Sequence, residues 1–466
     1  MLWGGLNSGI QQLVGLAFGI VLGRLLSPSD YGMMAMISIF SLVATALQDS
    51  GFRTALTNIE HPKHEDYNSV FWFNIIMASS LYVILFLAAP LIGEYYHTPR
   101  VVPLCRYAFL SIVIASFGTA QSAYLFKHLR AKQQAEAGAL AVILSSLTGV
   151  GMAFAGMAYW SLATQGLVYV GINTLLQWHF SPWRPSIHGI TFAPVRRMFR
   201  FSCKILATTI MTHVNNNVLN ILLGHYFTPR DTGNYNQAYQ WNNKCYSLVQ
   251  SMVAQVAQPV LVSLNGEEGR QKDVFRKMMR FTAFITFPLL FGFGLVAKEF
   301  IVTAIGEKWL ASAQLIQILC LSGAAMPLST LFSNMIISKG RSGTFFWCTF
   351  TLGLVQIATM IMIWPMGIRW MVIAYTLLNT SWLLVWLFFV RRLIGYGYWM
   401  FFCDVMPFAL AAAGVMGVAY VATMPLSNMI ALLITRFIIA VVLYYVVMKL
   451  ARVKILAECE RFVKRS

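Results

Sequence analysis

GRLLSPSDYG at residues 23–32 returns 201 positions later as GHYFTPRDTG at residues 224–233. Each copy follows one apolar run and precedes another. In each copy a Ser or Thr can cap a helix, and the Pro after it suits the first helical position. The Asp two residues later falls in the first turn, where the helix dipole favours negative charge. The pattern predicts the same tight, capped turn between two helices, made twice.

The composition predicts a membrane protein. Of the 466 residues, 58% are hydrophobic and only 11% are charged, whereas soluble domains carry about 25% charged residues. A membrane span needs about 20 mostly apolar residues, and such runs recur along the whole chain. We therefore expect an all-α polytopic protein, with the first run retained as a span rather than cleaved as a signal peptide. The expected spans are 4–26, 31–48, 68–92, 103–126, 137–158, 160–180, 201–227, 232–260, 281–304, 309–337, 343–364, 370–390, 400–423 and 428–449.

The count of fourteen spans has one alternative, twelve, in which the last two runs are re-entrant. The net charge of +18 is explained by topology. With the N-terminus in the cytoplasm, 24 of the 34 Lys and Arg residues fall on the cytoplasmic side and only seven outside, as the positive-inside rule requires. Both termini are then cytoplasmic, and the charge needs no nucleic-acid partner.

The repeat continues beyond the turn. Ile92-Gly93-Glu94 matches Ile305-Gly306-Glu307, and similar residues open the sixth and twelfth spans. Each copy holds six spans, an even number, so the copies share one orientation. We expect two pseudo-symmetric lobes around a central cavity, followed by two additional helices. The expected parts are an N-lobe at 1–183, a cytoplasmic interfacial linker at 184–200, a C-lobe at 201–393, the additional helices at 394–450 and a basic cytoplasmic tail at 451–466.

Polar residues gather in the first two spans of each copy, and helical spacing places many of them on one face. A long polar face against lipid is costly, so these faces should meet protein or water. Lys244 lies about twelve residues into its span, ~18 Å deep by helix rise, where a cation is commonly functional. The expected polar lining is Gln11, Gln12, His213, Asn216, Asn220, Gln237, Gln240, Ser247 and Ser251.

Other charged residues are weighed against simpler roles. Lys204 lies one turn from a cytoplasmic helix end and can snorkel. Arg436 and Asp404 lie in the additional helices, where a structural partner is expected, and 264–280 is expected to be a solvated helix or loop. His213 has no second His or carboxylate at ligand spacing, so no metal site is predicted.

Several stretches carry a family resemblance: GRLLSPSDYG, DSGFRTAL at 49–56, NSVFWFNI at 68–75, SPWRPS at 181–186, GNYNQAYQ at 233–240 and GEKWL at 306–310. In combination they resemble the polysaccharide transporter branch of the MOP flippase superfamily. They are most similar to its Wzx-type, colanic-acid-exporter-like lipopolysaccharide biosynthesis proteins. The resemblance runs from the first span through the twelfth.

The resemblance implies a multi-pass flippase in the bacterial inner membrane, not an enzyme. Its substrate would be an oligosaccharide on undecaprenyl diphosphate, moved from the cytoplasmic to the periplasmic leaflet for lipopolysaccharide, capsule or exopolysaccharide synthesis. Membrane lipids and the polysaccharide polymerase machinery are the implied partners. No cofactor or catalytic residue is implied. Related flippases use cavity cations for the diphosphate, and the resemblance implies that the matching positions are among Arg24, Arg53, Lys204 and Lys244.

The coupling ion stays open between H⁺ and Na⁺. Some superfamily members bind sodium through an acidic residue on helix seven, where this chain has Asn215-Asn216-Asn217. Two other functions stay open. A multidrug exporter of the same superfamily would favour a carboxylate in the cavity, and a polysaccharide polymerase or ligase would need a sizeable outside loop with catalytic Arg or His.

Overall fold

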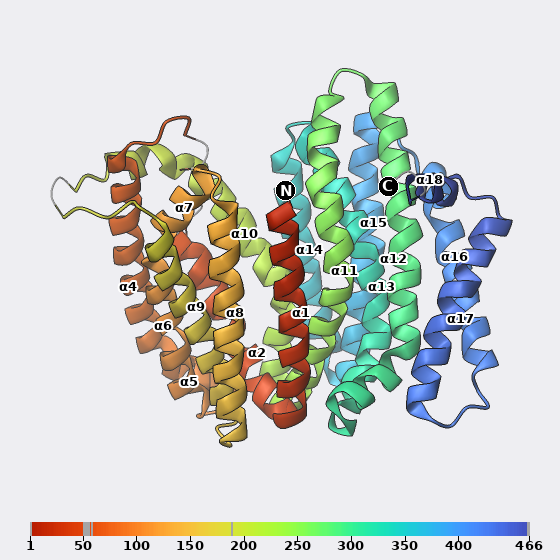
Figure 1. Ribbon diagram of the computed structural model, residues 1–466, viewed down its shortest axis with the longest axis horizontal. Coiled ribbons are helices and arrows are strands. Elements are labelled where there is room, and N and C mark those ends of the chain that lie inside the picture. Colours follow the sequence, from red (N-terminus) through yellow and green to blue (C-terminus); the bar gives the residue numbers. More distant parts are fainter. Residues whose placement is uncertain (1, 50–55, 57–58, 188–189, 464–466) are drawn as a thin grey trace. The chain divides into compact units, whose positions relative to one another are not determined.

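The computed structural model describes residues 2–49, 56, 59–187 and 190–463, and in this part every regular element is a helix (Figure 1). Two compact units divide the chain, Met1–Gly233 and Asn234–Ser466. The helices of the first unit are α1 (Leu2–Leu25), α2 (Pro28–Asp49), α4 (His64–Tyr95), α5 (Val101–Ala108), α6 (Leu110–Ser116), α7 (Thr119–Lys127), α8 (Ala131–Phe154), α9 (Tyr159–Phe180) and α10 (Ala193–Tyr226).

The second unit contains most of α11, which starts in the last residues of the first unit. Within this unit α12 packs against α13, α16 and α17, and α13 packs against α15. Its helices are α11 (Pro229–Ser263), α12 (Glu268–Ile305), η1 (Glu307–Trp309), α13 (Leu310–Ser338), α14 (Ser342–Ile363), η2 (Trp364–Met366), α15 (Ile368–Ile394), α16 (Tyr398–Ala422), α17 (Met429–Leu450) and α18 (Lys454–Val463).

Each of the fourteen predicted spans coincides with one helix or with a broken series of helices. Ten helices in the described residues are long and apolar enough to cross a membrane, or up to eleven if one bent pair forms a single span. Both α16 and α17 are among the ten, which favours fourteen crossings over twelve. The exact number of crossings stays a prediction.

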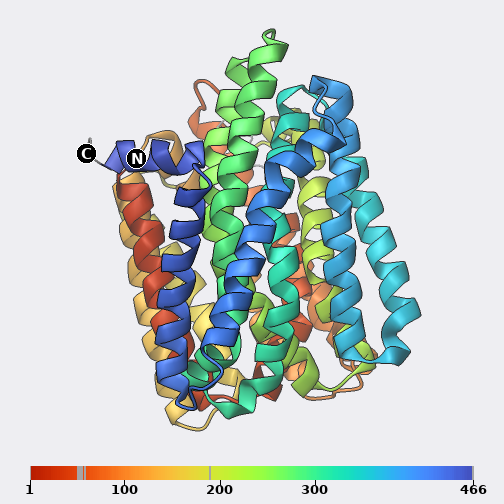
Figure 2. The same cartoon turned by 90° about the vertical axis from the view of Figure 1, so that its right-hand side faces the viewer.

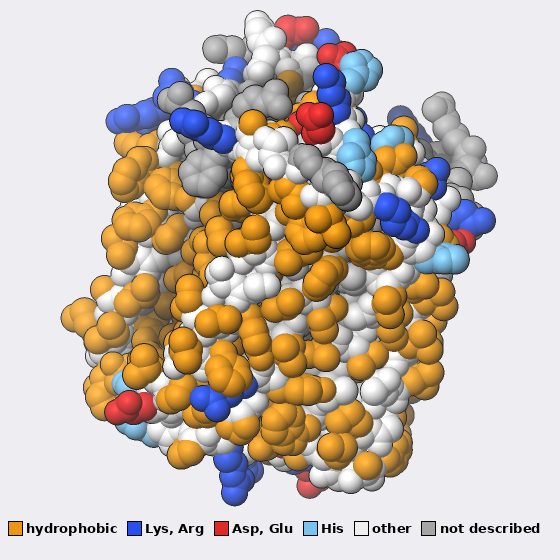
Figure 3. All heavy atoms as spheres, turned by 90° about the vertical axis from the view of Figure 1, so that its left-hand side faces the viewer, with side chains coloured by type: hydrophobic (Ala, Val, Ile, Leu, Met, Phe, Trp, Pro, Cys, Tyr) orange, Lys and Arg blue, Asp and Glu red, His pale blue; other side chains and the backbone are white. Residues whose placement is uncertain are grey.

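The surface agrees with a membrane environment. Figure 3 shows a broad hydrophobic band, with charged side chains gathered towards its two ends. On α4 the large apolar side chains of Ile76, Val83, Leu87 and Leu91 are more than half exposed. Large exposed apolar surfaces are rare on soluble monomers, so this band is the part of the molecule that lies in lipid.

The repeated turn has the predicted capped form in both copies. The Ser27 hydroxyl donates to Asp30 Oδ2 at 2.7 Å, and the Asp30 amide donates back to Ser27 Oγ at 3.4 Å. In the second copy the Thr228 hydroxyl donates to Asp231 Oδ2 at 2.7 Å, and the Asp231 amide donates to Thr228 Oγ1 at 3.2 Å. These reciprocal bonds satisfy donors at the start of each helix that would otherwise be unpaired.

The two copies also contact each other, and all the residues of this contact belong to the first unit. A Cβ atom on Gly32 would lie 1.7 Å from the carbonyl oxygen of Pro229, and one on Gly233 would lie 1.8 Å from that of Pro28. No side chain fits at either distance, so the first turns of α2 and α11 touch backbone to backbone. Glycine is what permits so close a helix crossing.

The fourth predicted span is broken, since Val101–Ser116 and Thr119–Lys127 meet at 43°. The break frees backbone carbonyls that a membrane interior leaves unsatisfied unless a neighbour supplies donors. Helix α9 supplies them: Trp178 Nε1 donates to Phe117 O at 2.7 Å, and Thr174 Oγ1 donates to Ile114 O at 3.4 Å. The bend is therefore hydrogen-bonded rather than strained.

A buried ion pair fixes α17 to α12. Arg436 Nη1 donates to Glu299 Oε1 at 2.8 Å, and both side chains are only 8% exposed. Arg436 Nε also donates to Thr423 Oγ1 at 3.0 Å. The structural partner expected for Arg436 is thus confirmed. Beyond α17 the short helix α18 lies crosswise to it (Figure 2), with Lys277 of α12 2.6 Å from Glu458.

Replacement of Gly32 by Ala should lower the apparent Tm of the purified protein, because the new Cβ would collide with the Pro229 carbonyl. We expect a loss of about 3 kcal/mol, typical of over-packing. The matched control is Gly171→Ala in α9, where a Cβ meets nothing within 4 Å. Equal Tm values for the two variants would contradict the backbone contact.

Arg436→Met and Glu299→Leu should each destabilise the protein by about 3–5 kcal/mol, because each leaves one buried charge without its partner. The double variant should recover most of the loss, since it removes both charges together. Thermal unfolding of the four proteins in one detergent gives the coupling energy. Additive losses in the double variant would show that the two residues do not depend on each other.

Candidate functional site

The predicted lining residues of the first spans lie on α1. Gln11 is partly buried, Gln12 is exposed, and Arg24 is exposed in the last turn. Arg53 falls outside the described residues. Lys204 lies in α10, but its side chain falls outside what the structure describes. The binding roles predicted for these three cations, like the role predicted for Lys244, stay proposals.

On α10 the predicted polar residues follow one another along the helix. Asn217 Nδ2 donates to His213 O at 3.0 Å, and Asn220 Nδ2 donates to Asn217 Oδ1 at 3.4 Å. His213 and Asn216 are partly buried and Asn220 is buried. Asn217 was not among the predicted lining residues, but its side chain bonds to both His213 and Asn220, which were. In the described part of the chain, no group of three or more His, Cys, Asp or Glu is placed to hold a metal ion.

Helix α11 divides its polar residues into two sets. One set bonds to α13: Asn242 Nδ2 donates to Leu319 O at 3.2 Å, Gln250 Nε2 donates to Thr330 Oγ1 at 3.0 Å, and Ser312 of α13 donates to Asn234 Oδ1 at 3.0 Å. These three residues hold α11 against the core of the second unit. Each of the three side chains has a hydrogen-bond partner inside the unit, although the buried Oδ1 atom of Asn242 has none.

The second set is the predicted lining. At about 100° per residue, these residues lie on the side of α11 opposite to the set that bonds α13. Gln237 is buried, Lys244 and Ser247 are partly buried, and Gln240 and Ser251 are exposed. The hydroxyls of Ser247 and Ser251 bond only to backbone carbonyls of their own helix. We call Gln237, Gln240, Lys244, Ser247 and Ser251 the α11 polar stripe.

Lys244 is the only cation of the α11 polar stripe. Its Nζ lies 4.4 Å from the centre of the Trp241 ring, a cation–π contact one turn away. Trp241 is itself buried and packs edge-on against Phe300 at 5.2 Å. None of the ion pairs in the described part of the second unit includes Lys244. An aromatic face can orient an ammonium group but does not neutralise it.

The α11 polar stripe can therefore do two things chemically. Its amide and hydroxyl groups can exchange hydrogen bonds with a polyhydroxylated ligand, because each can serve as donor or acceptor. Its ammonium group can pair with an anion such as phosphate. Helix α11 contains no acidic residue beyond Asp231 in its first turn, so the stripe favours anions over cations.

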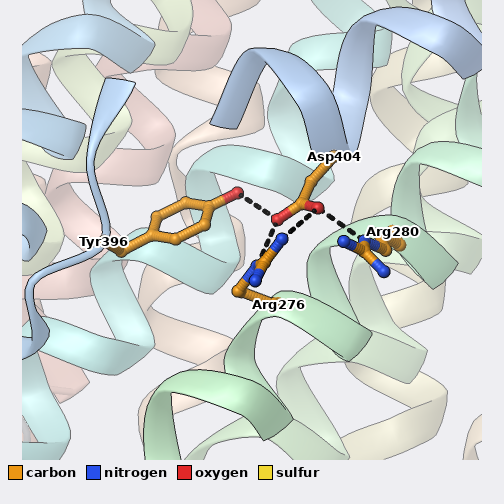
Figure 4. Close-up of polar contacts among 4 residues, drawn as sticks. All are labelled: Arg276, Arg280, Tyr396 and Asp404. Atoms are coloured by element: carbon orange, nitrogen blue, oxygen red, sulfur yellow. Dashed lines mark hydrogen bonds and ion pairs between the residues drawn. The ribbon is translucent and has the colours of Figure 1, made fainter. Parts of the chain in front are cut away.

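One cluster of charged residues was not predicted. Arg276 and Arg280 of α12 both bind the buried carboxylate of Asp404 in α16, together with the Tyr396 hydroxyl (Figure 4). The structural role expected for Asp404 is thus confirmed. The expectation of a solvated helix or loop at 264–280 is wrong for these two arginines, which are held in a tertiary contact. Their i, i+4 spacing was visible, but the sequence did not reveal that α16 packs there.

Known proteins share this fold. The chain is an all-helical, multi-pass membrane protein, and 97% of it superposes on 99% of a solved structure of the lipid II flippase MurJ in an inward closed conformation, with a TM-score of 0.77 and 13% sequence identity. Residues 21–314 match the model of the family described as polysaccharide biosynthesis protein, and the chain belongs to this family.

Two curated relatives are similar over most of the chain. The lipopolysaccharide biosynthesis protein WzxC of Escherichia coli strain K12 is 24% identical, over 73% of this chain and 69% of its own length. The succinoglycan biosynthesis transport protein ExoT of Rhizobium meliloti strain 1021 is 22% identical, over 83% of this chain and 76% of its own. The family resemblance predicted from the sequence motifs is thereby confirmed.

Lys244→Met should leave the apparent Tm unchanged or raise it, because it removes a partly buried charge without leaving a carboxylate of its unit unpaired. Arg436→Met, the matched substitution at a paired cation, should lower Tm markedly. Thermal unfolding of both variants checks the contrast. A large loss of stability in Lys244→Met would assign Lys244 to the structure rather than to a ligand.

Proposed function

We propose that this protein is a flippase that moves undecaprenyl-diphosphate-linked oligosaccharide from the cytoplasmic to the periplasmic leaflet of the bacterial inner membrane. The observation that carries the proposal is the α11 polar stripe, with Lys244 and no carboxylate on the side of α11 away from α13. The names of the relatives support it, since one is a lipopolysaccharide biosynthesis protein and another a succinoglycan biosynthesis transport protein.

The chemistry of the substrate sets the requirements. A diphosphate cannot enter hydrocarbon as a bare anion, because removing its water shell costs far too much energy. Lys244 would neutralise part of this charge, with Arg24, Arg53 and Lys204 as further candidates. The amides and hydroxyls lining the path would bond to sugar hydroxyls, while the lipid tail would stay in the bilayer. No chemical bond is made or broken, so the protein would not be an enzyme.

Alternating access is the proposed mode of transport. Two lobes at 1–183 and 201–393 would open the cavity in turn to each leaflet, with both termini in the cytoplasm. The coupling ion, H⁺ or Na⁺, is not assigned. Membrane lipids and the polysaccharide polymerase machinery are the proposed partners of this cycle.

A multidrug exporter of the same superfamily is the second candidate, and several solved exporters share the fold, among them an inward-facing one with a TM-score of 0.67. Cationic drugs would favour a carboxylate along the path, and the α11 polar stripe has an ammonium group instead. A polymerase or ligase is less well supported, because several described connections are short, such as 155–158 between α8 and α9.

Lys244→Ala should abolish polysaccharide export in cells while the amount of protein in the membrane stays normal. Lys244→Arg should retain part of the export, since it keeps the charge but changes the shape of the donor group. Ser263→Ala is the control on the same helix but outside the stripe, because it removes an exposed hydroxyl that bonds to its own helix. Normal export with Lys244→Ala would remove the assigned role.

Purified protein in vesicles should carry labelled lipid-linked oligosaccharide between leaflets without changing it. Movement of a cationic dye in place of the glycan lipid would favour the exporter. Formation of a longer glycan would favour the polymerase.

A further inference from the structure

The cluster around Asp404 holds more positive charge than its structural role needs. Arg276 alone makes a two-point contact with the carboxylate, Nε to Oδ2 at 2.9 Å and Nη2 to Oδ1 at 3.1 Å. Arg280 adds a third bond, Nε to Oδ1 at 2.5 Å, and Tyr396 donates to Oδ2 at 3.2 Å. One carboxylate therefore faces two guanidinium groups. The exposed Asp273 carboxylate also acts electrostatically on Arg276, so Arg280 is the cation that shares Asp404 and has no carboxylate of its own.

The Asp404 carboxylate already accepts four hydrogen bonds, and its single negative charge cannot neutralise both arginines. Asp404 is fully buried, whereas the side chains of Arg276 and Arg280 are 29% and 43% exposed. Burial, and then the neighbouring Asp404 carboxylate, raise the pKa of the Tyr396 phenol, so Tyr396 remains a neutral donor. In the described residues, no hydrogen bond from the Nη atoms of Arg280 to another protein group is found. These N–H groups are open to a ligand.

Further cations lie close to the cluster. Lys272 is two turns before Arg280 on the same face of α12, and its Nζ lies 3.8 Å from the position of a Cβ on Gly395, in the turn between α15 and α16. Arg391 at the end of α15 lies 5.7 Å from the Tyr398 ring. The acidic neighbours are few: Asp273 is exposed, and Glu458 is bound to Lys277.

The position of Arg280 along α12 places the cluster at the level of lipid headgroups. The next 17 residues, 281–297, carry no charge and end at Lys298. At 1.5 Å per residue this run spans ~26 Å, close to the ~30 Å hydrocarbon core. Trp399, in the first turn of α16, is 80% exposed, as interfacial tryptophans commonly are. The Lys and Arg distribution puts this end of the unit on the cytoplasmic side.

We propose that Arg280, with Arg276 and Lys272, binds the phosphate of an anionic phospholipid headgroup in the cytoplasmic leaflet, beside α12 and α16. A phosphate diester supplies the missing negative charge, and its oxygens match the parallel N–H donors of a guanidinium group. The lipid would then tie the additional helices α16 and α17 to α12 at their cytoplasmic ends. This site is independent of the proposed transport function.

The test uses full-length protein in neutral phosphatidylcholine nanodiscs, titrated with phosphatidylglycerol. Wild type should bind phosphatidylglycerol and show a higher Tm than in phosphatidylcholine alone. Arg280→Gln should raise the Kd for phosphatidylglycerol by about tenfold, the effect of losing one charge-assisted contact. Arg270→Gln, an equal charge loss on α12 at a 68% exposed residue, is the matched control and should stay within about twofold of wild type.

Three outcomes distinguish the phospholipid site from its alternatives. Equal phosphatidylglycerol binding by wild type and Arg280→Gln would overturn the site. If Arg280→Gln is less stable even in phosphatidylcholine, loss of the additional Tm gain from phosphatidylglycerol still supports it, and retention of that gain overturns it. Binding of undecaprenyl diphosphate or inorganic phosphate that depends on Arg280, without binding of phosphatidylglycerol, would overturn the phospholipid assignment and give the phosphate site to the carrier lipid or to free phosphate.

Discussion

Hydrocarbon offers no hydrogen bonds, and this constraint explains where the polar groups of the protein lie. The carbonyls freed by the break between α6 and α7 are bonded by Trp178 and Thr174. Arg436 is bonded to Glu299 and Thr423. Asn234, Asn242 and Gln250 of α11 are bonded to α13. Each of these residues has a hydrogen-bond partner inside its own unit, so a charged side chain within a span that has no charged partner there stands out.

Two cations within the spans illustrate the difference. Arg436 bonds to the Glu299 carboxylate and the Thr423 hydroxyl and is buried, as expected of a residue that holds helices together. Lys244 lies over the aromatic ring of Trp241 and is partly exposed. A charge without a counter-charge in its unit costs stability, and a ligand that brings the counter-charge recovers that cost on binding. The same reasoning applies to Arg280 at the membrane surface, where the surplus charge is of the same sign.

Much of the fold could be predicted from the sequence because its signals are local. Apolar runs about 20 residues long predicted the helices, and Ser27, Asp30, Thr228 and Asp231 predicted both caps. Tertiary pairing left no such signal. Nothing local to Asp404 reveals that Arg276, 128 positions away, bonds to it. The division of α11 into two polar faces was also hidden, because the spacing of Asn242 does not indicate whether α13 or water lies opposite it.

The contact between Gly32 and Gly233 restricts how the duplicated halves can be varied. Each glycine makes room for the proline carbonyl of the other copy, so a side chain in one half collides with the other half, whatever residue is placed there. Chimaeras that exchange one half for the equivalent half of a relative must therefore bring a glycine and a closely matching turn. The two copies of the turn therefore constrain each other's sequence, and they can be exchanged only together.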